Sequence, residues 1–415
     1  MLARFKRYAA EQHLIPEGTT VLLAVSGGRD SVAMVDLFHR AGVPFEIAHC
    51  NFNLRPGDCD RDEAFVRQLA DRYGVPCHVA RFDTRAYAAD NGMSIEEAAR
   101  HLRYDYFAQL STPHSPLSTP VATAHHADDS IETFFLNLFR GTGLHGLHGI
   151  RPISSLITHH SSLTIIRPLL CFSRADIDAY IDERGLQYVE DYTNAELDAR
   201  RNRIRHQLMP LLRELYPSVD QTMLANIERL NATEELLDTY IDQLRQQLIK
   251  PYTSILPATD YQLPPIEDLD LPQLIAHHSS FITLFELLRP YGFNAATVAD
   301  ISQTIKQSGN QPLSGRLFYS PTHVAELHRG QLLITLQFQP STPNSQFSIL
   351  NSQFSIRPWR PGDRFRPKGM KGTRLVSDFL KDLHLSRIEK QYVLVRVDAD
   401  DRILAVVGLR DSALI

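Results

Sequence analysis

A glycine-containing hexapeptide near the N-terminus holds the residues best placed to bind an anion. Residues 26–31 read Ser-Gly-Gly-Arg-Asp-Ser, directly after the apolar run VLLAV and before a helical pattern. Glycines allow a tight turn whose backbone N–H groups face an anion, and the following helix N-terminus adds about half a positive charge. The hexapeptide is neither a Walker A loop nor a GxGxxG dinucleotide fingerprint. We predict a phosphate-binding turn, with an ordinary Gly-Gly turn as the alternative; its residues are Ser26, Gly27, Gly28, Arg29, Asp30 and Ser31.

A second polar cluster follows the short apolar run at 121–123 and opens a helix. It contains His125, His126, Asp129 and Glu132. Asp129 and Glu132 are three residues apart and therefore share one face of a helix. Such a pair could bind Mg²⁺ with a triphosphate, or hold a cationic substrate amine and later take its proton. In the alternative interpretation the acids only cap the helix, and zinc is disfavoured because neither HExxH nor CxxC is present.

Arginines gather at three further places. The helical segment 94–104 carries Glu96, Arg100 and Arg103 at helical spacing, which is also typical of a solvated, salt-bridged face. Residues 200–205 hold four arginines in six positions, a pattern that suits phosphate or an RNA backbone. A third segment opposes seven basic residues with one acid, Asp363; they are Arg357, Arg360, Arg364, Arg366, Lys368, Lys371 and Arg374.

Alternating apolar strands and amphipathic helices must position these residues. Apolar runs at 21–25, 45–48, 75–82 and 121–124 alternate with helical patterns, which predicts an α/β fold with a parallel sheet flanked by helices. Ligands of such sheets bind beyond the carboxyl ends of the strands, so the polar clusters that follow the strands are expected to meet in one crevice.

The rest of the chain predicts separate parts with different patterns. The stretches 113–120 and 154–162 are expected to be surface loops, and 251–270 a linker or long loop. Residues 217–250 predict helix, and 313–339 a small antiparallel sheet. The expected domains are a Rossmann-like catalytic domain at 1–215, a helical and small-sheet middle domain at 216–340, a duplicated Ser/Asn/Gln-rich linker at 341–356 and a small basic α+β domain at 357–415.

Composition excludes several classes of protein. The net charge of −5 rules out a uniformly basic nucleic-acid coat protein, although local basic patches remain. Four cysteines without a CxxC pair are too few for a disulfide framework and predict a reduced compartment. The chain offers neither an apolar signal core nor an apolar run long enough for a bilayer, so we expect a cytoplasmic protein that does not associate with membranes.

The motifs together resemble a known family. SGGRDS after a strand is similar to the PP-loop of the N-type ATP pyrophosphatases. More narrowly, the segments HCNFNLR, SIEEAARHLRY, AHHADDSIETFFLNLFRGTGLHGL, RPLL and DYTN…RRNRIRH, in this order, resemble tRNA(Ile)-lysidine synthetase. RPWRPGDRFRPKGMKGTRLVSDFL is similar to the terminal domain of that family. The resemblance thus covers the N-terminal and C-terminal parts of the chain, whereas the middle region is weakly matched.

The resemblance implies a ligase that joins L-lysine to carbon 2 of the wobble cytidine of an isoleucine tRNA with a CAU anticodon. The implied reaction adenylates the cytosine oxygen with ATP, releases pyrophosphate, and lets the lysine ε-amine displace AMP. The modified base then pairs with adenosine, so codon specificity changes from AUG to AUA. ATP and Mg²⁺ are the implied cofactors, and the expectation of a homodimer rests on the resemblance alone.

The resemblance also suggests roles for single residues. Ser26 to Ser31 would bind ATP with Asp30 near Mg²⁺ and the pyrophosphate, and Asp129 and Glu132 would hold the lysine ammonium. Candidates for adenylate, pyrophosphate or tRNA-phosphate contacts are His125, Arg103, Arg201 and Arg205, and the candidates for further tRNA contacts are Arg357, Arg360, Arg364, Arg366, Lys368 and Lys371.

Two other functions are alternatives to the ligase. An RNA thiolase of the same group relies on reactive or cluster-bound cysteines, which the spacing of Cys50, Cys59, Cys77 and Cys171 does not offer. A nucleotide-binding regulatory protein would leave the acidic pair and both basic clusters without a role.

Overall fold

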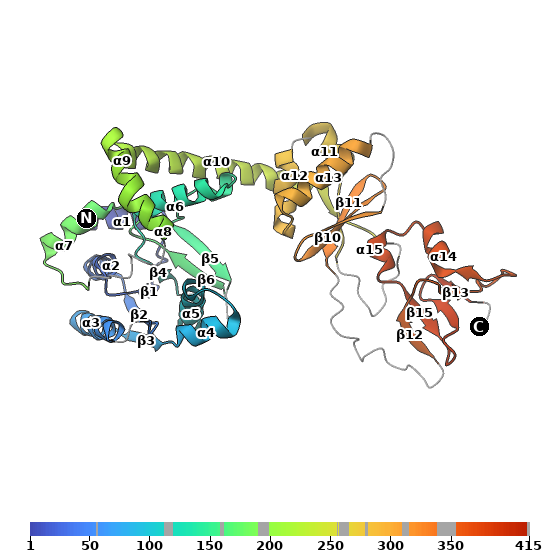
Figure 1. Ribbon diagram of the computed structural model, residues 1–415, viewed down its shortest axis with the longest axis horizontal. Coiled ribbons are helices and arrows are strands. Elements are labelled where there is room, and N and C mark those ends of the chain that lie inside the picture. Colours follow the sequence, from blue (N-terminus) through green and yellow to red (C-terminus); the bar gives the residue numbers. More distant parts are fainter. Residues whose placement is uncertain are drawn as a thin grey trace. The chain divides into compact units, whose positions relative to one another are not determined.

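The chain forms two compact units, Met1–Glu235 and Leu236–Ile415 (Figure 1). The computed structural model describes residues 1–54, 57–111, 119–157, 162–189, 199–254, 256, 265–278, 281–308, 315–337 and 354–412. The expected loop at 113–120 and the duplicated linker at 341–356 therefore lie almost wholly outside the described residues. Within the described part, no helix combines the length and apolar character that a membrane crossing requires.

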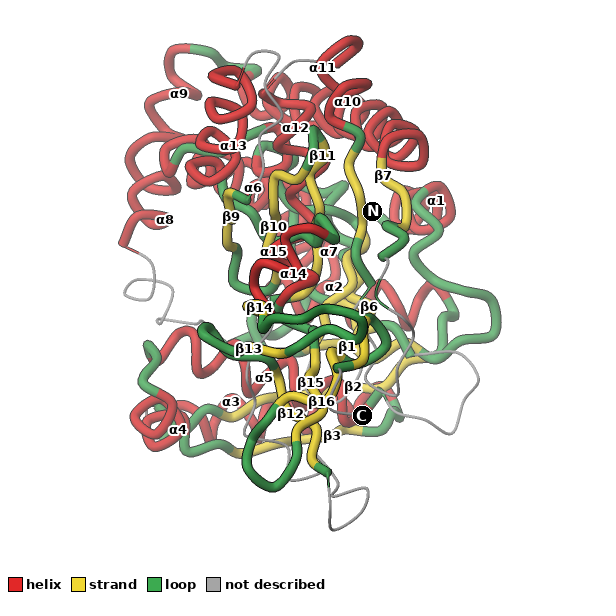
Figure 2. Tube along the Cα trace, turned by 90° about the vertical axis from the view of Figure 1, so that its right-hand side faces the viewer, coloured by secondary structure: helices red, strands yellow, loops and turns green. Residues whose placement is uncertain are grey.

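The first unit is built on a mixed, mostly parallel sheet. The strand order is β3-β2-β1-β4-β6-β5, and only β5 runs antiparallel to its neighbour among the described strands. Figure 2 shows β1, β2 and β3 side by side. The sheet confirms the predicted fold class; its strands are β1 (Val21–Ala24), β2 (Phe45–Asn51), β3 (Cys77–Arg81), β4 (Val121–Ala122), β5 (Ile153–Ile157) and β6 (Ser162–Ile166).

Helices cover both faces of this sheet because the apolar strand residues point to both sides. Val21, Leu23 and Ile47 pack with the helices of one face in the largest buried cluster. Leu22 and Ala48, the alternate residues, pack on the other face. The helices of the first face are α1 (Leu2–Glu11), α2 (Arg29–Ala41), α3 (Asp58–Tyr73) and α7 (Arg174–Arg184), whereas α5 (Ile95–Leu110) lies on the second.

Further helices complete the unit and lead out of it. α4 (Thr84–Asn91) precedes α5, and α6 (Ala127–Arg140) follows β4. The long α10 (Val219–Leu248) confirms the predicted helical region and contributes residues to both units. Short helical turns lie between these elements: η1 (Leu144–Gly146), α8 (Ala199–Arg203), the π-helical η3 (Ile204–Leu208) and α9 (Met209–Leu215).

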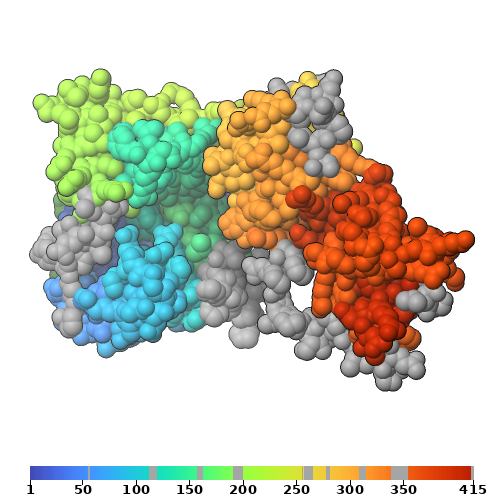
Figure 3. All heavy atoms as spheres, turned by 45° about the vertical axis from the view of Figure 1, so that its right-hand side comes forward, coloured from blue at the N-terminus to red at the C-terminus, as the bar shows by residue number. Residues whose placement is uncertain are grey.

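The second unit contains two antiparallel sheets and two short paired strands. A sheet of order β7-β8-β11-β10-β9 packs on helices through one apolar cluster. A sheet of order β12-β15-β16-β17 belongs to the segment after residue 354, which is orange to red in Figure 3. The elements are β7 (Ile249–Pro251), β8 (Glu267–Leu269), α11 (Leu271–His278), α12 (Phe281–Leu288), η4 (Arg289–Tyr291), α13 (Ala295–Ser308), β9 (Arg316–Tyr319), β10 (His323–His328), β11 (Gln331–Leu336), β12 (Ser355–Pro358), β13 (Arg364–Phe365), β14 (Arg374–Leu375), α14 (Val376–Asp382), α15 (Arg387–Lys390), β15 (Leu394–Val397), β16 (Ile403–Val406) and β17 (Arg410–Asp411).

The structure contradicts parts of two sequence predictions about loops; residues 158–161 of the first and 257–264 of the second lie outside the described residues. Residues 154–162 were expected to form a surface loop, but Ile153–Ile157 is strand β5, paired antiparallel to β6. The polar character that suggested a loop suits a strand at the edge of the sheet. The stretch 251–270 is not only a linker, because its described ends contribute to β7 and β8.

Candidate active site

The glycine turn links the carboxyl end of β1 to the first turn of α2. Gly27 has φ +93°, a conformation that favours glycine, and an added Cβ would contact Phe65 and Val66 at 3.4 and 3.5 Å. The two serines tighten the turn: Gly27 N donates to Ser31 Oγ at 3.2 Å, and Gly28 N donates to Ser26 Oγ at 3.3 Å. The first residues of α2 then present backbone N–H groups that have no carbonyl acceptor within the helix. Such free donors are what an anion-binding site requires.

This turn opens on a cavity of about 890 Å³ that gathers eight of the predicted residues of the first unit. The carboxyl ends of β1, β2 and β4 all contribute to its wall, which confirms that the polar clusters meet in one crevice. Asp129, Glu132 and Arg205 are not among the lining residues, nor is Gly27. The predicted residues that do line it are Ser26, Gly28, Arg29, Asp30, Ser31, Arg103, His125 and Arg201.

Asp30 is engaged by an arginine from another helix. Arg174, the first residue of α7, donates from Nη1 to Asp30 Oδ1 at 2.5 Å and from Nη2 to Asp30 Oδ2 at 2.9 Å. The same Nη2 lies 2.9 Å from His126 Nε2, which must accept because a guanidinium only donates. A guanidinium thus occupies both carboxylate oxygens, so Asp30 as it lies does not fit the predicted Mg²⁺ role.

The two acids of α6 are also paired with arginines. Glu132 is 2% exposed and accepts from Arg201 Nε at 3.1 Å and from Arg205 Nε and Nη2 at 2.6 and 2.8 Å. Asp129 Oδ1 accepts from Arg205 Nη2 at 3.2 Å, and Asp129 Oδ2 accepts from the backbone N–H of His126 at 3.1 Å. Two carboxylates and two guanidiniums therefore balance each other, with Arg201 reaching the cavity wall.

The local environment lowers the pKa of two titratable groups here. Burial lowers the pKa of His125 to about 4, and Arg167, Arg201 and Arg103 add to this effect against the opposing charge of Asp129. The pKa of Asp129 also lies below its usual value: burial raises it, but the neighbouring imidazoles, the His126 N–H and Arg201 outweigh that effect. Both groups therefore keep one protonation state near neutral pH, His125 neutral and Asp129 ionised, which makes them weak bases.

The arginines of α5 lie against aromatic rings. The guanidinium of Arg100 lies 5.0 Å from the ring centroid of Tyr104, and that of Arg103 lies 5.3 Å from the centroid of Phe52. Within the described residues no ion pair joins Glu96 to Arg100, and both side chains are exposed. Both arginines line the cavity.

The basic segment of the second unit divides into structural and exposed residues. Arg357 is tied to Asp363 by two bonds of 2.8 and 3.0 Å and to Asp401 at 2.7 Å, and its side chain is only 13% exposed. Arg366 Nε donates to the carbonyl of Met370. The exposed members of the predicted tRNA-contacting set in this segment are Arg360, Arg364, Arg366, Lys368 and Lys371.

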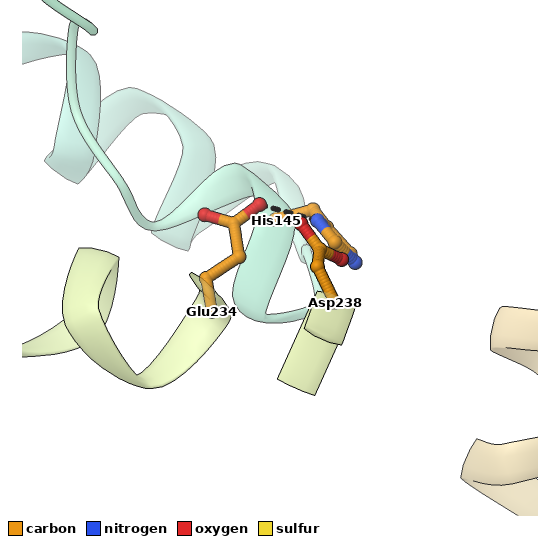
Figure 4. Close-up of side chains that lie close together, drawn as sticks. All are labelled: His145, Glu234 and Asp238. Atoms are coloured by element: carbon orange, nitrogen blue, oxygen red, sulfur yellow. Dashed lines mark hydrogen bonds and ion pairs between the residues drawn. The ribbon is translucent and has the colours of Figure 1, made fainter. Parts of the chain in front are cut away.

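One buried carboxylate outside the cavity joins two helical elements. Figure 4 shows Glu234 of α10 pointing toward His145 of η1, with Asp238 one turn further along α10. Glu234 accepts hydrogen bonds from His145 Nδ1 and from Arg151 Nη2. Burial raises the pKa of Glu234 but these two partners lower it overall. Since protein donors already satisfy this carboxylate, we assign it a structural role.

Sequence reasoning missed Arg174, which the structure places at the centre of the site. Ser173 and Asp176 form a capping box at the start of α7, a pattern that is readable from the sequence and predicts a helix N-terminus there. The backbone N–H of Arg174 donates to Asp128 Oδ2 at 2.8 Å, which joins α7 to α6. The sequence contains a signal for the helix start but none for the partner 144 residues away.

The fold and the site define a PP-loop protein, and comparison with known proteins agrees. The family model of the PP-loop domain matches residues 2–212. The models of the TilS substrate binding domain and the TilS substrate C-terminal domain match residues 267–338 and 354–414. Among solved structures, the U34-tRNA thiolase NcsA from Methanococcus maripaludis is 18% identical with a TM-score of 0.45, covering 55% of this chain and 78% of that one.

Curated relatives narrow the class to one family. A tRNA(Ile)-lysidine synthase of Bacteroides thetaiotaomicron is 35% identical over 98% of this chain and 94% of its own length. The enzyme of Parabacteroides distasonis is 34% identical over 99% and 95%, and that of Bacillus subtilis 27% identical over 98% and 93%. The chain belongs to the tRNA(Ile)-lysidine synthase family, whose members are PP-loop ligases.

Proposed function

We propose that this protein joins L-lysine to carbon 2 of the wobble cytidine in an isoleucine tRNA with a CAU anticodon, at the expense of ATP. The observation that carries the proposal is the cavity in which the glycine turn, His125 and the arginines of α5 and α8 meet. Its size suits a nucleotide together with part of a second substrate. Family membership supports the reaction, and we propose that it takes place in this cavity.

The chemistry requires that the cytosine oxygen first become a leaving group. ATP bound with its phosphates at residues 26–31 would transfer AMP to that oxygen and release pyrophosphate. Amine attack at carbon 2 would then expel AMP and form the new carbon–nitrogen bond. Arg103 and Arg201 line the same cavity and would stabilise the negative charge that develops on the phosphates. Mg²⁺ would accompany ATP through phosphate oxygens.

We propose that lysine binds beside the cluster of Asp129 and Glu132. An amino acid carries charges of both signs, and so does this cluster of two acids with Arg201 and Arg205. The acids would hold an ammonium of lysine while Arg201 at the cavity wall contacts a carboxylate or phosphate. Because the pKa of Asp129 is low, we assign it an electrostatic role in this step, and the proton of the reacting amine must leave by another route.

The tRNA would contact basic side chains of both units. In the second unit the exposed Arg360, Arg364, Lys368 and Lys371 are available for phosphate, together with the partly engaged Arg366. Arg205 is bound to Glu132, so its tRNA role requires a change of partner. A cytoplasmic location and a homodimer complete the proposal, as expectations from the sequence.

The decisive experiment supplies the full-length protein with ATP, labelled lysine and a CAU-anticodon isoleucine tRNA transcript. Label transferred to RNA, with AMP and pyrophosphate as products, supports the ligase. A transcript whose wobble cytidine is replaced by uridine is the matched control and should accept no label. ATP binding without any transfer of label would instead favour a nucleotide-binding regulator and contradict the proposal.

A further inference from the structure

We propose that Asp30 acts as a positioning residue for Arg174, and that Arg174 is the cation that contacts the ATP phosphates at this end of the cavity. The inference deepens the proposed function and rests on its use of ATP. It differs from the role expected from the sequence, in which Asp30 itself binds Mg²⁺. The two roles make opposite demands on the same carboxylate.

The geometry of the pair matches that of an oriented guanidinium. Two parallel N–H···O bonds of 2.5 and 2.9 Å fix the plane of the Arg174 side chain against Asp30. His126 Nε2 holds Nη2 from a second direction at 2.9 Å. Of the five N–H donors of a guanidinium, these contacts use three, and among the described residues the other two have no acceptor. Arg174 therefore keeps donors for a further acceptor.

The surroundings of Arg174 favour an anionic acceptor. Its side chain is 36% exposed and lines the cavity beside Ser26 and Gly28 of the turn. Asp30 lies in the first turn of α2 and Arg174 is the first residue of α7, so two helix N-termini meet here. Helix N-termini attract anions and disfavour cations. A phosphate that reaches this point meets a guanidinium already in place, whereas a metal ion would first have to displace it.

The backbone of Arg174 is also held by a hydrogen bond. Its N–H donates to Asp128 Oδ2 at 2.8 Å, and Asp128 Oδ1 accepts from Arg213 Nη2 at 2.9 Å. The start of α7 is thus held by α6, and the guanidinium is held by α2. Because both ends of the side chain are restrained, loss of the Asp30 carboxylate removes the main restraint on the direction of the guanidinium.

The test is a double-mutant cycle on nucleotide affinity, measured by calorimetry on the full chain. Asp30→Asn, Arg174→Gln and the double variant are titrated with ATP in EDTA and again across a Mg²⁺ series. We expect Arg174→Gln to weaken ATP binding in EDTA about 10- to 100-fold, the loss typical of a charge-assisted hydrogen bond. Asp30→Asn should weaken it too, and the double variant should be no weaker than Arg174→Gln, because the two residues act as one unit.

Two further variants keep the test independent of folding defects. Arg174→Lys retains the charge but not the planar fork, and should give an intermediate loss. Arg4→Gln removes another arginine–aspartate bridge to α7, at Asp176, away from the cavity lining, and should bind ATP as the wild type does. If the wild type itself binds no ATP, the proposed function fails before this inference is tested.

The opposite result would identify Asp30 as a metal ligand. In that case Asp30→Asn would leave ATP affinity in EDTA unchanged or improve it, since a negative charge near the phosphates is removed. It would also raise the Mg²⁺ concentration that gives half-maximal ATP binding. Either finding, or additive effects in the double variant, overturns the assignment of Asp30 as the positioning residue for Arg174.

Discussion

Replacing Glu132 with glutamine should destabilise the first unit strongly. The carboxylate is 2% exposed and accepts three N–H bonds, from Arg201 and Arg205. Removing its charge leaves two guanidiniums without their main counter-charge. Breaking a buried ion pair in this way costs about 3–5 kcal/mol. The arginine side chains are 30% and 28% exposed, so water screens part of the loss, and we expect the low end, about 3 kcal/mol.

Urea unfolding can measure this loss unit by unit. With an m-value of about 3 kcal/mol/M, a loss of about 3 kcal/mol lowers the midpoint by about 1 M. Circular dichroism follows the whole chain, whereas Trp359, the one tryptophan of the sequence, reports on the second unit. The fluorescence transition should therefore stay in place while the first-unit transition moves. Glu183→Gln, an exposed glutamate of α7, is the matched control.

A double variant distinguishes the stability lost with the hydrogen bonds from the stability lost by leaving a guanidinium without its counter-charge. Adding Arg205→Gln to Glu132→Gln removes one of the two orphaned guanidiniums, so the double variant should lose less than the sum of the single losses. The lysine concentration that half-saturates transfer should also rise, because the cluster next to the proposed lysine site is altered. A wild-type urea midpoint in Glu132→Gln, with only the lysine requirement raised, would refute the structural reasoning.

Two further predictions address titration and tRNA binding. The pKa of His125 is about 4 in the folded protein, against 6.5 in its unperturbed state. As the pH falls, the unfolded chain therefore binds a proton at this residue before the folded protein does. The free energy of unfolding thus decreases as the pH drops from about 6.5 toward 4. Urea midpoints at pH 7 and 4.5 should therefore differ less in His125→Gln than in the wild type; an equal difference would contradict the shift. Reversing the charge at Arg364 and Arg366 should weaken tRNA binding and flatten its salt dependence without changing ATP affinity, whereas Arg357→Gln should mainly lower stability. Filter binding across a salt series checks the tRNA affinity, and urea unfolding checks the stability of Arg357→Gln. An unchanged affinity in the charge-reversal variant would exclude these residues from the tRNA contact.

The sequence was sufficient for the order of elements and for the position of the crevice. Leu23 and Ile47 belong to apolar runs that can be recognised from the local sequence alone. Parallel strands bring their carboxyl ends to the same edge of the sheet, whatever side chains follow them. This is why Ser26 and His125 could be assigned to one crevice, whereas Arg103 of α5 became a candidate through the family resemblance. Strand β5 was not predicted because it lies at the edge of the sheet, and its polar residues interrupt the apolar run that is typical of a buried strand.

The pairing of charges could not be read from the sequence. Asp30 and Arg174 are 144 residues apart, and Glu132 meets its arginines about 70 residues further along the chain. Which carboxylate takes which guanidinium depends on side-chain reach after the helices have packed, so no local spacing encodes it. The same limit applies to Arg357, which looked like part of a tRNA-binding patch and is held by Asp363.

The division of the cavity arginines into two kinds follows from these pairings. Arg174 and Arg201 are bound to carboxylates, so a ligand that uses them must share or exchange partners. Arg100 and Arg103 lie instead against aromatic rings, contacts that a phosphate need not break, because a guanidinium can stack by its face and donate by its edge. We therefore expect an anion entering the cavity to reach the α5 arginines without breaking an ion pair, and the paired arginines to fix its orientation. Among the described residues, the unpaired positive charge and the oriented guanidiniums thus lie on different helices. Local sequence patterns indicate the arginine-rich helix, but they do not indicate the ion pairs that orient the other arginines.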